Sequence, residues 1–140
     1  MKKILMALSL LVMSYLPFSA HAMTETTDGI YAVSFHADWC PGCKILSPKM
    51  DEVRSSGELD GKNILFVKFN VTDKTTTHQS MLHAEALGLG ELFKENAGKT
   101  GFILLLDPKT HEVLGKITPE MDVDKIKATF LENASTHQKE

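Results

Sequence analysis

The stretch from Ala32 to Met50, AVSFHADWCPGCKILSPKM, decides the fold of this chain. It continues an apolar segment that starts at Ile30 and runs to Phe35, which is typical of a buried parallel strand. From Cys40 onward apolar side chains recur at helical spacing, and Pro41 occupies a first-turn position where proline is tolerated. The sequence therefore predicts a strand over residues 30–35 and a helix that begins at Cys40.

The chain contains only two cysteines, Cys40 and Cys43, and they lie three positions apart. A structural disulfide stabilises a protein more when it closes a longer loop, and so short a loop gains little. Reactivity therefore explains this pair better than stability does.

The remaining sequence predicts further alternation of strands and helices. A strand, a helix and a second strand in this order imply a right-handed crossover and a parallel pair, so we expect a central sheet with helices on both faces. The expected elements are a strand at 63–70, helices at 75–87 and 91–96, a hairpin of strands at 102–106 and 112–117, and a helix at 122–133.

The N-terminus has the pattern of a secretory signal peptide. Lys2 and Lys3 precede an apolar run of residues 4–16, and Ala20-His21-Ala22 supplies small residues for cleavage. The run is shorter than the roughly 17 to 25 residues that cross a bilayer as a helix. We therefore expect residues 1–22 to be removed and the chain to be exported to a bacterial periplasm, without a stable membrane anchor.

The mature chain, residues 23–140, is expected to form one domain with its core over residues 30–133. The whole chain has a formal charge of −3, and removal of the two signal lysines makes it −5. Nucleic acids and anionic membranes are bound through clustered Lys and Arg. No such cluster occurs, so we expect neither as a partner.

The central segment resembles the active-site strand and helix of the thioredoxin family. The likeness extends beyond the two cysteines: Trp39 precedes the first, Lys44 follows the second, and Pro48 stands five residues further on, where the family kinks its helix. This resemblance implies a thioredoxin-like α/β fold of order βαβ–α–ββα, with a four-stranded mixed sheet. It also implies a protein-disulfide oxidoreductase that needs no cofactor.

The expected chemistry follows from the position of the cysteines. A thiolate at a helix N-terminus is stabilised by free backbone N–H groups and by the helix dipole, so Cys40 is the expected nucleophile. Cys43, one turn further in, is the expected resolving thiol. The substrate-binding surface is expected to include Trp39, Pro41, Thr100 and Gly101. Lys68 and Asp38 are expected as auxiliary residues.

Two positions depart from the family pattern. Gly101 stands where thioredoxin-like proteins place a cis-proline, and Ser34 stands where thioredoxins carry a buried Asp that helps to deprotonate the resolving cysteine. A non-proline cis bond costs roughly 2.5 to 4 kcal/mol, so the Thr100-Gly101 bond is predicted to be trans. We expect the loop there to differ in shape, and whether loss of the proline ring lets the cysteines bind a metal ion stays open.

Three functions remain open at this point. The favoured one is exchange of disulfides with exported protein substrates, in the reducing direction, with a membrane thiol reductase as a candidate electron donor. The second is a copper or zinc module that uses Cys40, Cys43 and His36. The third is a non-catalytic binding domain, for which Ser34 and Gly101 are the only arguments.

Overall fold

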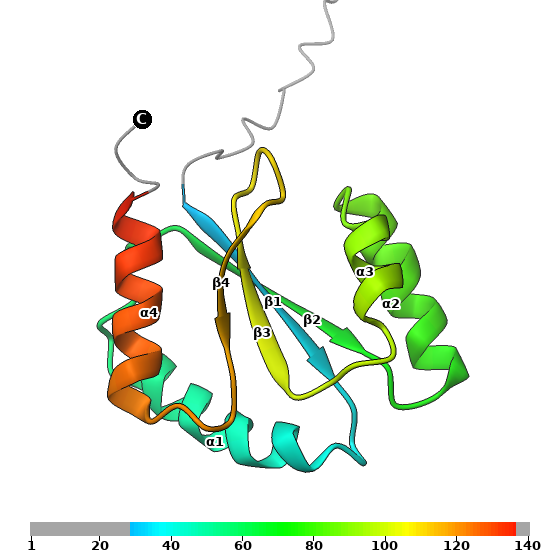
Figure 1. The fold of residues 1–140 in the computed structure, drawn as a ribbon, viewed down its shortest axis with the longest axis horizontal. Coiled ribbons are helices and arrows are strands. Elements are labelled where there is room, and N and C mark those ends of the chain that lie inside the picture. Colours follow the sequence, from blue (N-terminus) through cyan, green and yellow to red (C-terminus); the bar gives the residue numbers. More distant parts are fainter. Residues whose placement is uncertain (1–28, 137–140) are drawn as a thin grey trace, which may run out of the picture.

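The computed structural model describes residues 29–136, which form an α/β domain (Figure 1). The elements follow the order strand, helix, strand, two helices, two strands and a final helix, as expected. They are β1 (Ile30–His36), α1 (Pro41–Ser55), β2 (Ile64–Asn70), α2 (Lys74–Ala86), α3 (Gly90–Asn96), β3 (Phe102–Leu106), β4 (Val113–Ile117) and α4 (Val123–Thr136). The signal peptide predicted at residues 1–22 lies outside the described residues.

The four strands form one mixed sheet with the order β2-β1-β3-β4. β1 pairs in parallel with β2 and antiparallel with β3, and β3 continues antiparallel to β4. β1 is therefore central, which explains its nearly unbroken apolar sequence. The thioredoxin-like fold and the four-stranded mixed sheet predicted from the sequence are confirmed.

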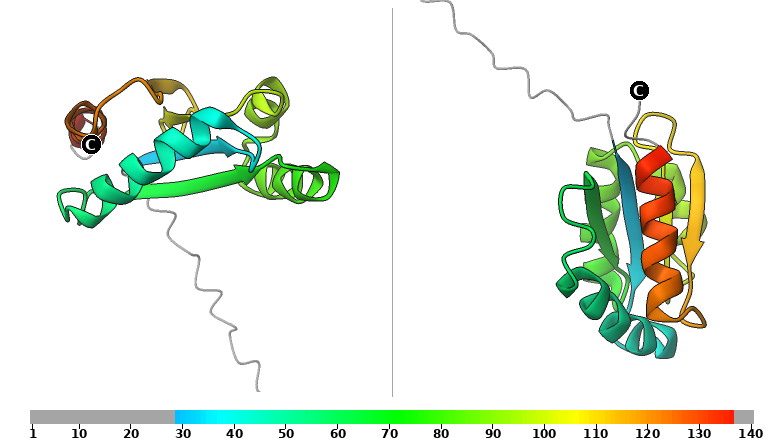
Figure 2. Two further views of the ribbon diagram at one scale, coloured as in Figure 1. Left: turned by 90° about the horizontal axis from the view of Figure 1, so that it is seen from below. Right: turned by 90° about the vertical axis from the view of Figure 1, so that its left-hand side faces the viewer.

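The helices cover both faces of the sheet (Figure 2). Residues of α1 and α4 pack with alternate residues of β1 and β3 in one hydrophobic cluster, which includes Met50, Ile103 and Phe130. Residues of α2 and α3 pack with the other alternate residues in a second cluster, which includes Phe35, Phe69 and Phe93. The second cluster also contains Cys40 and Cys43, so the reactive pair sits at the end of this core.

β2 forms an edge of the sheet in spite of its nearly continuous apolar sequence, and Leu65 and Lys68 on it are exposed. An apolar run does not distinguish a central strand from an edge strand covered on one face. The last helix extends three residues beyond the expected Asn133, because Ala134 is still buried against the sheet.

We expect Phe93 to hold α3 on the sheet. Its side chain is 3% exposed, and its ring centroid lies 5.3 Å from that of Phe69 and 6.1 Å from that of Phe35. The Phe93→Ala variant should lose about 3 to 5 kcal/mol of unfolding free energy in urea titrations, the usual cost of removing a buried aromatic ring. The Leu82→Ala variant, whose side chain is 56% exposed on α2, is the control. Equal losses in both variants would contradict this packing.

Candidate functional site

Cys40 caps the N-terminus of α1. Its backbone is extended, and its Sγ accepts a hydrogen bond from the Cys43 backbone N–H at 3.1 Å. Pro41 follows as the first residue of the helix and has no N–H to satisfy. The sulfur therefore lies among the free donors of the first turn, where a thiolate is stabilised.

Cys43 lies one turn into the helix and forms a disulfide with Cys40, with their Cα atoms 5.3 Å apart. Its Sγ is 3.8 Å from the carbonyl oxygen of Phe35, at the end of β1, so a thiol there can donate to that oxygen in the reduced protein. Cys40 is 3% exposed and Cys43 is 4% exposed. The structure thus brings together the two residues predicted to carry the chemistry.

The loop before β3 closes directly over this pair. Gly101 donates its N–H to the Phe35 carbonyl at 3.0 Å and has a φ of +85°, a conformation that favours glycine and that proline cannot adopt. A Cβ at this position would lie 3.2 Å from the Cys40 Sγ. No peptide bond within residues 29–136 is cis, so the Thr100-Gly101 bond is trans, as predicted.

Glycine at this position lets the loop lie close to the Cys40 sulfur, and both cysteines are buried. Within residues 29–136, no group of three His, Cys, Asp or Glu side chains could hold a metal ion. His36 pairs instead with Asp38, with Nε2 and Oδ1 3.3 Å apart.

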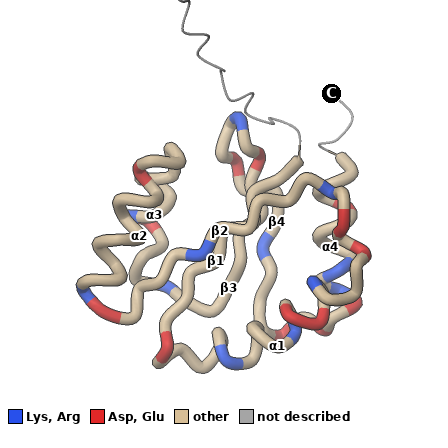
Figure 3. Tube along the Cα trace, turned by 180° about the vertical axis from the view of Figure 1, so that it is seen from behind, with Lys and Arg blue, Asp and Glu red and all other residues tan. Residues whose placement is uncertain are grey.

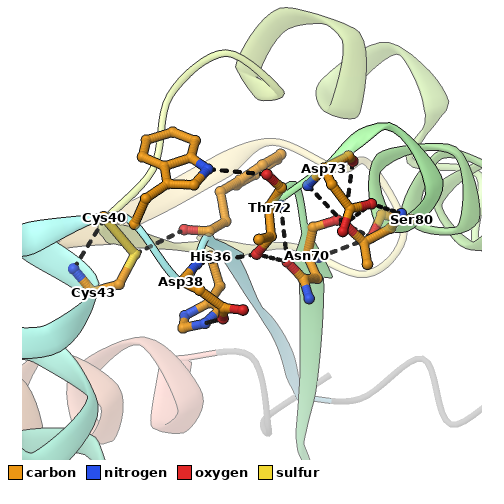
Figure 4. Close-up of polar contacts among 11 residues, drawn as sticks. His36, Asp38, Cys40, Cys43, Asn70, Thr72, Asp73 and Ser80 are labelled. Atoms are coloured by element: carbon orange, nitrogen blue, oxygen red, sulfur yellow. Dashed lines mark hydrogen bonds and ion pairs between the residues drawn. A yellow bond between two sulfur atoms is a disulfide. The ribbon is translucent and has the colours of Figure 1, made fainter.

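The segment Ala37 to Trp39 is held by the end of β2 (Figure 4). The Trp39 Nε1 donates to the Thr72 carbonyl at 3.0 Å, and the Asp38 N–H donates to the Thr72 hydroxyl at 3.0 Å. That hydroxyl donates in turn to the Asn70 side-chain oxygen at 2.6 Å. Trp39 is 59% exposed, so this network fixes a projecting indole beside Cys40.

The same network continues into α2. The Ser80 hydroxyl donates to the Asn70 carbonyl at 2.9 Å and accepts the Asn70 N–H at 2.8 Å. Asp73 caps the helix by accepting the Thr76 backbone N–H, and this bond lowers the pKa of the Asp73 carboxyl. Sequence analysis missed Asn70, Thr72 and Ser80, because nothing local marks residues that bond across 10 or 33 positions.

A cavity of about 280 Å³ lies between α1 and the face of the sheet that α1 covers, and Cys43 is one of its lining residues. Ser34, Lys68 and His36 line it together with Cys43. The Ser34 hydroxyl donates to the Val67 carbonyl at 3.2 Å, and Lys68, its partner in the sheet register, is exposed. Lys68 therefore occupies a solvated edge position and borders the cavity that Cys43 also lines.

The comparisons with known proteins agree with this arrangement. The family model described as Thioredoxin matches residues 17–86, half of the chain. The chain belongs to the thioredoxin family.

Among the solved structures, StoA from Bacillus subtilis shares the fold. StoA from Bacillus subtilis is 23% identical over 73% of this chain and 82% of its own, with a TM-score of 0.50. A thiol:disulfide interchange protein from Chlorobium tepidum TLS is 21% identical over 76% of this chain and 80% of its own, with a TM-score of 0.49. No curated protein matched the chain.

This thioredoxin-family chain also tethers the loop before α4 to the active-site helix. The Lys49 Nζ donates to the carbonyls of Pro119 and Met121 at 2.6 and 2.7 Å. A Cβ at Gly42 would lie 3.1 Å from Pro119 and 3.5 Å from Gly101. Gly42 thus permits two loops to meet over the turn between the cysteines, a contact that the sequence did not predict.

We expect the Gly101→Ala variant to strain the site. A left-handed conformation costs a non-glycine residue roughly 1 to 2 kcal/mol, and the added methyl would press on the Cys40 sulfur. Urea unfolding of the oxidised protein should show that loss. The matched control is the Gly98→Ala variant, where a Cβ meets nothing within 4 Å. A Gly101→Ala protein as stable as the control would disprove the close approach.

Proposed function

We propose that this chain is an exported thiol:disulfide oxidoreductase that exchanges disulfides with partner proteins and works mainly as a reductase. The observation that carries the proposal is the placement of Cys40 at the N-cap of α1 with Cys43 one turn inside it, joined as a disulfide. Membership of the thioredoxin family supports the same chemistry.

The reaction consists of two exchanges. The Cys40 thiolate attacks one sulfur of a substrate disulfide, so the substrate's S–S bond breaks, a mixed disulfide forms and one substrate thiolate leaves. The Cys43 thiolate then attacks the Cys40 sulfur, which releases the second substrate thiolate and closes the Cys40-Cys43 bond. Two electrons pass to the substrate. The Cys40-Cys43 disulfide must then be reduced again, and we propose a membrane thiol reductase as the electron donor.

The substrate would dock on the surface around the buried sulfurs, where Trp39 and Pro41 are exposed. Trp39 projects beside Cys40, Pro41 is exposed at the start of α1, and Thr100 and Gly101 border the opposite side. Asp38 lies next to this surface, and Lys68 lies on the cavity side. We assign the first four residues to substrate contact and the other two to auxiliary electrostatics.

Proteins that carry thiols or disulfides are the proposed partners, and nucleic acid is not. In the view of Figure 3, Lys and Arg alternate with Asp and Glu along α1, α4 and the loops. Such mixed charge does not supply the positive stripe that phosphate backbones require.

The proposed compartment is the periplasm, reached through a signal peptide at residues 1–22 that is cleaved to leave one domain at 23–140. This proposal rests on the sequence pattern of basic residues, a short apolar run and Ala20-His21-Ala22. Within residues 29–136, the structure contains no helix that is long and apolar enough to span a membrane.

Trapping tests the catalytic proposal. A Cys43→Ala protein keeps the nucleophile but cannot resolve the mixed disulfide, so it should accumulate covalent adducts with partner proteins in the exporting cell, seen on non-reducing gels. The matched control is the Cys40→Ala, Cys43→Ala double variant, which should form none.

The wild type should also reduce insulin faster than a small dithiol at equal thiol concentration. Insulin reduction at only the small-dithiol rate would favour the non-catalytic binding domain.

Export has a separate test. The full chain produced in a Gram-negative host should be recovered from the periplasm with Met23 as its first residue by N-terminal sequencing. An Ala20→Glu, Ala22→Glu variant should retain its leader, because signal peptidase requires small residues at these positions. Wild-type protein found only in the cytoplasm with its N-terminus intact would contradict the localisation.

A further inference from the structure

The resolving cysteine faces a chemical difficulty that its surroundings expose. Cys43 must lose its thiol proton before it can attack the mixed disulfide, yet its side chain is 4% exposed and its polar neighbour at 3.8 Å is the Phe35 carbonyl oxygen. A peptide carbonyl accepts a hydrogen bond but does not take up a proton at ordinary pH. The proton must therefore leave by another route.

The cavity of about 280 Å³ provides that route, because Cys43 is one of its lining residues. The hydroxyls of Ser34 and Ser47 also line it, and a polar space of this size admits several water molecules. Serine hydroxyls do not act as bases at ordinary pH. The candidate acceptors in the protein are the titratable side chains around the cavity.

Besides Cys43, four charged or titratable side chains line the cavity: His36 on β1, Asp51 and Arg54 on α1, and Lys68 on β2. The Arg54 guanidinium, which lies 4.7 Å from the centre of the Phe66 ring, and the Lys68 ammonium have no free acceptor. Asp51 is eight residues beyond Cys43 on α1, which corresponds to about 12 Å of helical rise. That distance is too long for a single bridging water.

His36 is the remaining candidate. It directly follows Phe35, whose carbonyl oxygen the Cys43 sulfur approaches, and it lines the same cavity as Cys43. Its Nε2 pairs with the Asp38 carboxylate at 3.3 Å, which favours a proton on Nε2 and leaves the Nδ1 lone pair available. A histidine oriented by a carboxylate is a suitable proton acceptor for a thiol. Asn70, its partner on β2, adds no charge.

We propose that His36 is the proton acceptor for Cys43, acting through water in the cavity beside α1. This inference rests on the proposed disulfide exchange. The Cys43 S–H proton passes to the imidazole, the resulting thiolate attacks the Cys40 sulfur, and the S–S bond to the substrate breaks as the Cys40-Cys43 bond forms. The imidazolium then returns its proton to the departing substrate thiolate or to water, so protons and electrons balance.

The two exchanges can be timed separately with dithiobis(nitrobenzoate), an aromatic disulfide that releases one coloured thiolate at each step. Reduced protein in excess should show a first phase from Cys40 attack and a second phase, independent of protein concentration, from resolution by Cys43. The Cys43→Ala variant, which should show the first phase alone, identifies the second. A wild type with no first phase would refute the proposed function, and the role of His36, which rests on that function, would fall with it. A first phase without the expected second-phase behaviour would refute the role of His36 alone.

The His36→Gln variant should keep the first phase and slow the second by about 100-fold at pH 7, the lower end of what a general base contributes. In the wild type the second phase should accelerate with pH within the range of about 5 to 8, where histidines usually change charge, and the variant should lose that rise. Added imidazole should partly restore the second phase of a His36→Ala protein. The His78→Gln variant, an exposed histidine on α2, should behave as the wild type.

Three results would overturn the inference. One is an unchanged second phase in His36→Gln protein. Another is a comparable loss in the Asp51→Asn variant, which should resolve at the wild-type rate. The third needs no variant: the pH dependence of the second phase in the wild type should coincide with the titration of the His36 ring followed by NMR, and a mismatch would exclude it. Circular dichroism confirms that each variant is folded.

Discussion

The carbonyl oxygen of Phe35 is the point on which the site depends. It accepts the Gly101 N–H at 3.0 Å and lies 3.8 Å from the Cys43 sulfur, so the end of β1 fixes both the facing loop and the active-site helix. The position of this oxygen is itself set by the Phe35 ring, which packs against Phe69, Phe93 and Phe102 with ring centroids 5.4 to 6.1 Å apart. The α2–α3 segment thus supports the cysteines from within the core.

The sequence predicted the elements well because each has a strong local signal. An apolar run before Cys40, a first-turn proline and helical spacing after it suffice to place the dithiol at a helix start. The edge position of β2 could not be predicted, since it depends on which strands pair. The Thr72 bonds to Trp39 and Asp38 and the Lys49 tether also join residues 33 to 72 positions apart, and no local pattern encodes them.

Gly101 shows what a glycine does at the position where the family places a proline. Its backbone adopts a φ of +85°, and a Cβ there would lie 3.2 Å from the Cys40 sulfur. Loss of a side chain allowed closer backbone approach, which is a common use of glycine where two chain segments meet. Gly42, which faces Gly101, likewise allows close approach of the loop that contains Pro119.

Ser34 and the cavity are connected by the same physical logic. A carboxylate at this position of the central strand would be costly to bury without partners, whereas the serine hydroxyl is satisfied by the Val67 carbonyl at 3.2 Å. The smaller side chain leaves volume beside Cys43 that polar groups line and water can enter. Proton removal then no longer requires a buried charge inside the sheet. The proton can pass to His36 at the end of the strand, which is partly exposed to solvent and pairs with the Asp38 carboxylate.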